Sequence, residues 1–195
     1  MKGTEEGQVT GLIADPIYHY IVMTDRVEGE RTERDVIDTP WVQRLRRIFQ
    51  LQSARWVFPS AEHTRFQHSL GTMHVAGVFS ERLYPSLSRI FREVLPSPFY
   101  IEELLRLAGL LHDIGHGPFC HFFDEQYLSR FKTNHEEIGQ HIIREGISPV
   151  LNGIRRSPHG SFKRGESIDP EHVAFLIKRP LKKENRKHPK WLLLL

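Results

Sequence analysis

The sequence has only one cysteine, Cys120, so it cannot form a disulfide bond within the chain. Absence of internal disulfides is typical of a reducing compartment, and we expect a cytoplasmic location. The longest apolar stretches, such as residues 191–195, are far too short to span a bilayer. Residues 1–10 are polar and lack the apolar middle of a secretory signal. The sequence therefore excludes a disulfide-stapled scaffold, and we expect no membrane association.

Charge of one sign is not in large excess, because 27 lysines and arginines are offset by 24 aspartates and glutamates, for a net charge of +3. The surplus gathers in the last part of the chain, at Lys178, Arg179, Lys182, Lys183, Arg186, Lys187 and Lys190. A basic run of this kind is usually a solvated segment, and contact with nucleic acid is the alternative. We therefore treat residues 178–195 as a basic segment outside the core, with nucleic acid as a candidate partner.

Strand patterns are also scarce. Residues 16–23 are rich in β-branched and aromatic side chains and predict a short arm, paired in a hairpin with Val36 and Ile37. Most of the remaining chain has apolar residues at helical spacing, and it predicts helices near 66–83, 101–113, 119–131, 135–147 and 171–177. We predict an all-α fold, a helix bundle with at most a small β-hairpin arm near the N-terminus, with its core at about 12–177.

Local patterns set several boundaries of these elements. Thr39 precedes Pro40, and a capping side chain ahead of a proline is typical of a helix start. Pro85 is predicted to close the helix at 66–83. Two prolines and two glycines between residues 155 and 170 predict a long loop.

Histidine, in contrast, is abundant and unevenly placed, because eight of the twelve histidines lie between His63 and His141. His112 and Asp113 stand side by side at the end of a very apolar predicted helix, just before a glycine turn. Burial of an imidazole and a carboxylate without partners is unfavourable, and a divalent metal ion would remove that cost. The alternative is an aspartate that only hydrogen-bonds the following turn, and the dipeptide alone does not decide between the two.

Further imidazole and carboxylate groups accompany this dipeptide. One lies in the preceding predicted helix and five follow: His68, His116, His121, Asp124, His135 and Glu136. A ligand set of imidazoles and carboxylates without thiolates suits Mn, Fe, Co, Ni, Zn or Mg ions and argues against a structural zinc–thiolate site. Such an ion lowers the pKa of a bound water and polarises a phosphoryl oxygen. The sequence therefore favours a divalent metal ion as cofactor.

Two motifs make this pattern specific: residues 58–71, FPSAEHTRFQHSLG, and residues 111–121, LHDIGHGPFCH. Together they closely resemble the HD superfamily of metal-dependent phosphohydrolases. The greatest similarity is to the branch that contains the sterile-alpha-motif-and-HD-domain dNTP triphosphohydrolase and the bacterial dNTPases. Residues 15–19, DPIYH, and residues 37–46, IDTPWVQRLR, also fit that branch. The likeness extends from about residue 12 to about residue 145, with the motifs in the same order.

The resemblance implies a metal site. His68, His112 and Asp113 match the first three metal ligands of the family, and we call them the metal triad. The fourth ligand in the family is an aspartate in an Asp-x-x-Asp-Tyr type of stretch on a later helix. This sequence has no such stretch, and Asp169, its last aspartate, has different neighbours. We therefore expect a single HD domain, residues 1–195, that lacks its C-terminal part.

The resemblance also implies catalytic residues. His116 and His121 match histidines that contact substrate phosphates, and either His121 or His135 is the candidate proton donor to the leaving 5′-oxygen. Asp124 and Glu136 match acidic residues that orient these histidines, which is a common arrangement in general acid–base catalysis.

Three further residues match the substrate pocket of the family. Arg65 matches an arginine that meets a phosphate, for which its fixed fork of donors is suited. Gln50 and Leu51 match a pair that lines the sugar pocket and rejects a 2′-hydroxyl. Simpler interpretations remain open: Arg65 could pair with Glu62, and Gln50 and Leu51 could be a helix end and a core residue.

The implied function is hydrolysis of deoxynucleoside triphosphates to deoxynucleoside and triphosphate, by attack of water on the α-phosphate. A nucleotide substrate and self-association into a homo-oligomer are expected for this branch. One alternative is an HD phosphohydrolase acting on nucleoside monophosphates, cyclic nucleotides or ppGpp. Another is a non-catalytic, nucleic-acid-binding or regulatory HD protein, which the incomplete ligand set and the basic segment would favour.

Overall fold

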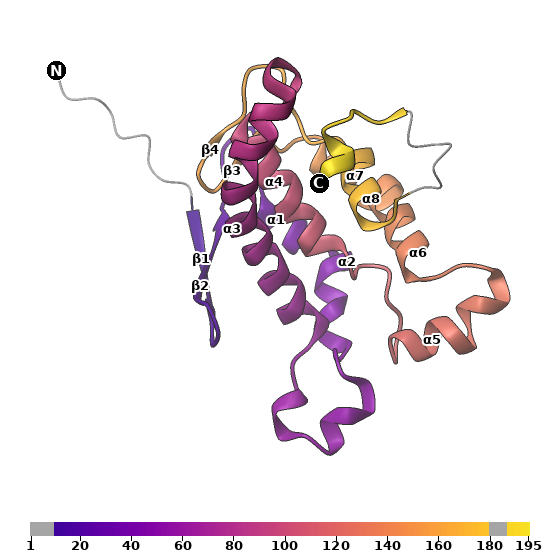
Figure 1. Ribbon diagram of the computed structural model, residues 1–195. Coiled ribbons are helices and arrows are strands. Elements are labelled where there is room, and N and C mark those ends of the chain that lie inside the picture. The colour runs from indigo at the N-terminus through magenta and orange to yellow at the C-terminus, as the bar shows by residue number, and fades with distance from the viewer. Residues whose placement is uncertain (1–9, 180–186) are drawn as a thin grey trace.

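The computed structural model describes residues 10–179 and 187–195, and the predicted all-α fold is confirmed. Helices make up the body of the molecule, and two small antiparallel hairpins are the strand pairings in the described residues. In Figure 1 the N-terminal hairpin lies on one side of two long central helices and the C-terminal residues lie on the other side. Of the predicted basic segment, Lys182, Lys183 and Arg186 lie outside the described residues.

The predicted β arm is present, but its pairing differs from the prediction. Strand β1 (Thr10–Asp15) pairs antiparallel with β2 (His19–Thr24). The Asp15 carboxylate accepts hydrogen bonds from the backbone N–H groups of the turn that joins the two strands. The predicted partner strand at Val36 and Ile37 is wrong, because these residues are buried in helix α1 (Glu33–Ile37). A capping box between Thr32 and Asp35 starts that helix.

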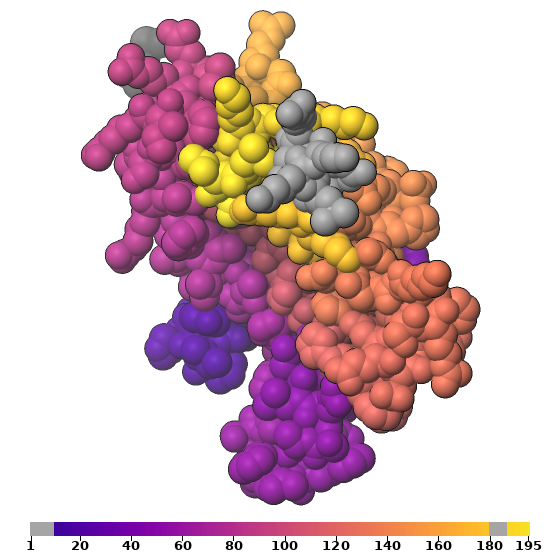
Figure 2. Space-filling model, turned by 45° about the vertical axis from the view of Figure 1, so that its right-hand side comes forward, coloured from indigo at the N-terminus to yellow at the C-terminus, as the bar shows by residue number. Residues whose placement is uncertain are grey.

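The predicted helix start at Thr39 and Pro40 is confirmed. Helix α2 (Pro40–Gln43) begins at Pro40, and the Thr39 side chain accepts a hydrogen bond from the backbone N–H of Val42. The chain continues as the 3-10 turns η1 (Arg44–Arg47), η2 (Gln52–Trp56) and η3 (Pro59–Ala61). The last two turns form a lobe that protrudes from the molecule, in purple at the bottom of Figure 2.

Helix α3 (Arg65–Phe91) is much longer than predicted. The predicted end at Pro85 is wrong, because the helix continues for six residues after it. Pro85 lies on the exposed side, where water can satisfy the carbonyl that its missing N–H leaves free. Leu87 is buried and the Tyr84 hydroxyl donates a hydrogen bond of 3.0 Å to the carbonyl of Pro96. These tertiary contacts hold the last turns of the helix in place.

Helix α4 (Pro98–Leu111) packs along α3 and forms the centre of the core. Ile101, Leu104, Leu107 and Leu111 are fully buried, as the apolar pattern predicts. The two helices approach closely at Gly109, where an added Cβ atom would lie 2.9 Å from the backbone oxygen of Thr72. This contact brings the end of α4 next to the first turns of α3.

The remaining elements complete the described part of the chain. They are η4 (Arg92–Val94), α5 (His121–Gln126), η5 (Leu128–Phe131), α6 (His135–His141), the π-helical turn η6 (Ile142–Ile147), α7 (Ser148–Leu151), β3 (Arg156–Ser157), β4 (Gly160–Ser161), α8 (Pro170–Ile177) and η8 (Leu192–Leu194). The predicted loop at 155–170 thus contains a small hairpin. Trp191 and Leu192 are buried, so the core extends beyond residue 177. Among the described residues, no helix is both long enough and apolar enough to cross a bilayer.

Candidate metal centre

The metal triad converges at the junction of α3 and α4. His68 lies in the first turn of α3, and His112 and Asp113 follow the last residue of α4. The two imidazole Nε2 atoms are 3.1 Å apart. The Asp113 Oδ2 atom lies 3.3 Å from Nε2 of His112 and 3.7 Å from Nε2 of His68. Three potential ligand atoms therefore face one point, as a metal site requires.

The orientation of His112 is set by the helix that carries it. Its Nδ1 atom lies 2.7 Å from the carbonyl oxygen of Gly109, one turn earlier in α4. Because a carbonyl oxygen can only accept, Nδ1 carries the proton and donates it, which leaves the lone pair of Nε2 free to bind a metal ion. The backbone thus supplies the outer-shell partner that metal-binding histidines commonly have.

Asp113 is a buried anion among cationic and imidazole groups. Burial by itself would raise the pKa of its carboxyl group, but contacts with His112 and His116 and the charge of Arg65 outweigh burial and hold that pKa well below its usual range. Burial lowers the pKa of His68, and the neighbouring His112 lowers it further. An ionised carboxylate and a neutral imidazole are the protonation states in which these side chains bind metals.

Arg65, predicted to meet a substrate phosphate, is buried and faces the triad. Its guanidinium group forms an ion pair with Asp113, and its Nε atom donates to Sγ of Cys120 over 3.1 Å. The alternative pairing of Arg65 with Glu62 is not the one found, because Glu62 lies 3.5 Å from Arg55. Arg65 therefore supplies positive charge beside the metal triad from a fixed position.

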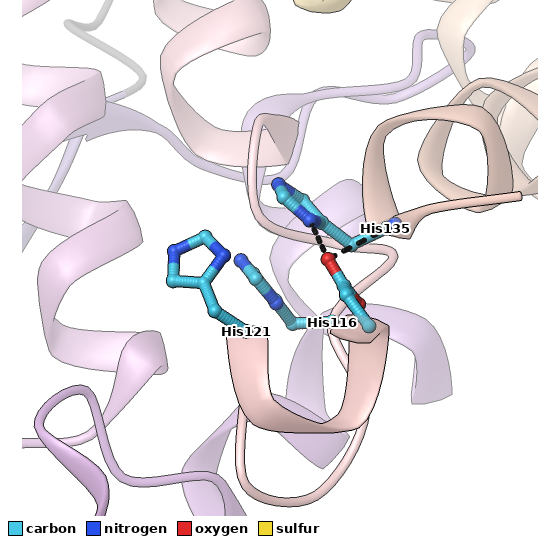
Figure 3. Close-up of side chains that lie close together, drawn as sticks. His116, His121 and His135 are labelled. Carbon is cyan, nitrogen blue, oxygen red and sulfur yellow. Dashed lines mark hydrogen bonds and ion pairs between the residues drawn. The ribbon is translucent and has the colours of Figure 1, made fainter. Parts of the chain in front are cut away.

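A second group of side chains lies next to the triad. It consists of His116, His121, Asp124 and His135, and we call it the imidazole cluster; its potential ligand atoms all lie within 4.8 Å of one another. Figure 3 shows the three histidine rings turned toward one another above the first turn of α5. The rings of His116 and His135 are stacked, with centroids 3.7 Å apart, and His135 Nδ1 pairs with the Asp124 carboxylate. Four of the five residues predicted to be catalytic are thus brought together.

The fifth of these residues, Glu136, points elsewhere. Its carboxylate lies 3.8 Å from Nζ of Lys178, at the start of α6. Gln50 and Leu51 occupy the turn between η1 and η2, where the backbone N–H of Gln50 donates to the carbonyl of His63. Leu51 is 46% exposed, so it is not a core residue. Gln50 therefore lies near the start of α3, and Glu136 lies outside both groups of ligand atoms.

Arg44 is a site residue that the sequence analysis did not single out. Its guanidinium group crosses from η1 to the turn after Asp113, where it donates to the carbonyl oxygens of Ile114 and His116, the latter at 2.7 Å. The side chain thereby fixes the turn that joins the metal triad to the imidazole cluster. In the sequence Arg44 is one of several arginines in a basic helix, so no local pattern distinguishes it.

Gly115 is the position in this turn that tolerates a side chain least. An added Cβ atom would overlap the carbonyl oxygen of His135 and lie 2.5 Å from the backbone nitrogen of Gly139. Helix α6 therefore packs directly on the backbone of the turn.

We expect Gly115→Ala to lower the free energy of unfolding by about 1–3 kcal/mol, as overpacking does. Urea denaturation would measure this, with Gly139→Ala as a control, because the Cβ position of this glycine in α6 meets no atom closer than 3.5 Å. Equal stability of Gly115→Ala and the wild type would contradict the packing described.

A groove of about 500 Å³ reaches the metal triad from one side. It runs between the β1–β2 turn and α3, and its lining includes Tyr18, His63, Gln67 and His68. A volume of this size is typical of a small-molecule site. The groove therefore gives a ligand access to one of the three triad residues.

A fourth carboxylate is not found beside the triad in residues 10–179 and 187–195. Asp169, the last aspartate of the sequence, caps α8 by accepting a hydrogen bond from the backbone N–H of Glu171. It also lies 3.6 Å from His172, within its own helix. Asp169 therefore has a structural role at a helix N-terminus.

Comparison with known proteins bears directly on this site. The family model of the HD domain matches residues 65–185, which include both groups of ligand atoms. The chain is 38% identical over 152 residues to the deoxynucleoside triphosphate triphosphohydrolase SAMHD1 of Homo sapiens. This aligned region is 72% of the chain and 22% of the relative. The chain is 35% identical over 133 residues to the SAMHD1 homolog of Dictyostelium discoideum, with 65% of the chain and 23% of the relative covered.

A viral relative is similar to the same degree. The putative HD domain-containing protein L394 of Acanthamoeba polyphaga mimivirus is 35% identical over 156 residues, which is 75% of the chain and 32% of that protein. The matched region is thus between about a fifth and a third of the length of these curated relatives.

Proposed function

The chain belongs to the HD domain family, and we propose that it is a metal-dependent phosphohydrolase that acts on deoxynucleoside triphosphates. The observation that carries the proposal is the convergence of His68, His112 and Asp113 next to the imidazole cluster. Similarity to deoxynucleoside triphosphate triphosphohydrolases in several organisms supports the substrate class. The proposed products are a deoxynucleoside and triphosphate.

The donor set of the triad fits a divalent ion. Two imidazole nitrogens and one carboxylate oxygen suit ions such as Mn, Fe, Co, Ni or Zn, and Mg less well. A bound ion supplies positive charge and a water of lowered pKa at the reacting phosphate. Arg65 adds a fixed positive charge beside Asp113, in the part of the site where negative charge develops on the phosphate oxygens.

We assign proton transfer to the imidazole cluster. In the proposed reaction water attacks the α-phosphorus, the bond from phosphorus to the 5′-oxygen breaks, and His121 delivers a proton to that oxygen. His121 is exposed and so within reach of a substrate, whereas the His135 imidazole is held by the Asp124 carboxylate. His116 is buried between His135 and the triad, where it orders the cluster.

Product analysis tests the proposal. We expect the metal-free chain, reloaded with Mn²⁺ and incubated with each dNTP, to release deoxynucleoside and triphosphate in equal amounts, as measured by ion-exchange chromatography. Release of pyrophosphate with a deoxynucleoside monophosphate would show cleavage of a different bond. Turnover of monophosphates, cyclic nucleotides or ppGpp in place of dNTPs would favour the alternative HD substrates. Metal-loaded protein that hydrolyses none of these would overturn the proposal and favour a regulatory role.

We also propose that the protein self-associates and resides in the cytoplasm. Support for self-association comes from the protruding lobe, where Trp56, Val57 and Phe58 are 74%, 72% and 60% exposed. Apolar groups exposed together in this way commonly mark contact surfaces.

Support for a reducing compartment comes from Cys120, a buried free thiol. Binding of nucleic acid through the basic segment stays a prediction, and Lys178 is already paired with Glu137 at 2.8 Å.

A further inference from the structure

We propose that residues 187–195 form a strap whose docking on the core is released when His172 is protonated. In Figure 1 the strap, in yellow, lies beside α8, the helix that carries His172. The strap docks through Trp191 and Leu192, which are 5% and 0% exposed. Its contact with the core is therefore apolar, and a charge that forms beneath it weakens that contact.

Trp191 covers a hydrogen-bonded pair of side chains. Its ring packs edge to face on the imidazole of His172, with centroids 5.3 Å apart, and on the ring of Tyr100, with centroids 6.1 Å apart. The Tyr100 hydroxyl oxygen lies 2.9 Å from Nδ1 of His172. The side chain of His172 is 15% exposed, so little water reaches this hydrogen bond while the strap is docked.

The neighbours of His172 fix the direction of this hydrogen bond. Nε2 of the imidazole faces the Asp169 carboxylate at 3.6 Å, and an ionised carboxylate can only accept, so Nε2 carries the proton. Nδ1 is then the acceptor for the Tyr100 hydroxyl. Burial raises the pKa of Tyr100, so this hydroxyl keeps its proton. An imidazolium carries protons on both nitrogens, and protonation of His172 therefore removes the acceptor that the hydroxyl needs.

Charged and titratable groups from three elements face His172. Burial lowers the pKa of His172 below 6.5, and His188 of the strap lowers it further, against the carboxylates of Asp169 and Glu171 at the start of α8. The titratable group that α4 brings to His172 is the neutral Tyr100. Because release of the strap removes part of this burial, the released state binds a proton more readily than the docked state. Docking should therefore weaken as the pH falls below 6.5, by up to about tenfold for each pH unit.

Release of the strap would also loosen the support of α6. Helix α8 holds α6 through Gln140, whose side-chain amide donates to the carbonyls of Ala174 and Lys178, each at 2.8 Å. Helix α6 begins at His135 and packs on the turn at Gly115. We therefore expect the proposed reaction to slow when the strap is released. This consequence rests on the proposed function, whereas release of the strap does not.

Fluorine NMR tests the proposal on the whole chain. Its three tryptophans are Trp41, Trp56 and Trp191, so labelling with 5-fluorotryptophan gives one resonance for each, and Trp191→Phe identifies the resonance of the strap. We expect the Trp191 resonance to move toward that of free 5-fluorotryptophan between pH 8 and pH 5.5, while the other two stay in place. In His172→Gln, whose amide does not titrate, Trp191 should stay docked over the whole range.

Two further variants sharpen the test. His141→Gln is the matched control, because it removes an exposed histidine of α6 and should keep the wild-type response. Tyr100→Phe removes the donor that favours the neutral imidazole, so release should occur at a higher pH than in the wild type.

Other results would overturn the proposal. A wild-type Trp191 resonance that does not respond to pH would do so, as would an equal response in His172→Gln. Movement of the Trp41 resonance at the same pH would show that the whole protein unfolds and that the strap is not released locally. Release of the strap in a protein that hydrolyses no dNTP would support this inference and contradict the proposed function alone.

Discussion

Replacing His112 with alanine is expected to abolish binding of an ion at the metal triad and to lower the rate of the proposed dNTP hydrolysis by about 1,000-fold or more. The reason is that His112 supplies one of three converging ligand atoms, with its Nε2 held toward the site by the hydrogen bond from Nδ1 to Gly109. Loss of the several kcal/mol of charge stabilisation that an ion provides corresponds to a rate effect of this size. Bound metal and initial rate, measured on the same preparation, would check the prediction.

His141→Ala is the matched control for this variant. Both substitutions remove one histidine, but His141 is exposed on α6 and lies outside both ligand groups. The side chain of His112 is 32% exposed, so its truncation should leave the thermal midpoint of unfolding of the metal-free protein nearly unchanged. If His112→Ala retained the wild-type metal content and rate, the metal triad would not be the site of the reaction.

Replacing Arg106 with methionine is expected to lower the free energy of unfolding by about 3–5 kcal/mol, the usual cost of leaving one member of a buried ion pair alone. Arg106 is 3% exposed and Glu33 is 0% exposed. The guanidinium Nε donates to Glu33 over 2.6 Å, and Nη2 donates to the carbonyl of Val22 over 2.7 Å. The side chain therefore ties α4 to both α1 and β2. Equilibrium denaturation in urea would measure the loss.

Glu103→Gln is the informative companion to Arg106→Met. Glu103 is fully buried, and both of its carboxylate oxygens are without a hydrogen-bond partner within the described ranges. Burial raises the pKa of this carboxyl well above 4.5, and the negative charge of Glu33 raises it further, against the opposing effect of Arg106. The folded state thus retains a proton that the unfolded state releases above pH 4.5. The free energy of unfolding should therefore fall as the pH rises above that value.

The glutamine variant cannot lose this proton. We expect Glu103→Gln to be at least as stable as the wild type at neutral pH, and to show a weaker decrease in stability between pH 5 and pH 8. A variant that is destabilised to the same extent as Arg106→Met would indicate that Glu103 is ionised and paired in the folded protein.

The proposed metal ligands could be singled out from the sequence because the relevant patterns are local. His112 and Asp113 are neighbours, and the motif around His68 spans a single loop and helix start. The helical class and the start of α2 at Pro40 were predictable for the same reason, since apolar spacing and capping depend on residues a few positions apart. The motif order along the chain was enough to indicate the family to which these residues belong.

Other features depend on residues far apart in the sequence. Helix α3 continues beyond Pro85 because Leu87 and Tyr84 are anchored by packing, which outweighs the preference of a proline to end a helix. Val36 and Ile37 form a helix and not a strand because the capping box before them directs the chain and the core accepts their side chains. Local propensity is weaker than such contacts, so the sequence pattern alone gave the wrong element.

The sequence by itself determined which side chains this protein offers to a metal ion and in which order. Only the tertiary structure decided where they point. Arg65 faces Asp113, 48 positions away in the chain, and Arg44 reaches the turn at His116 over 72 positions. The physical reason is that electrostatic attraction and burial depend on distances in space and not on positions in the chain. The packing of α3 against α4 determines which group lies beside a buried arginine, and the residues next to that arginine in the sequence do not predict it.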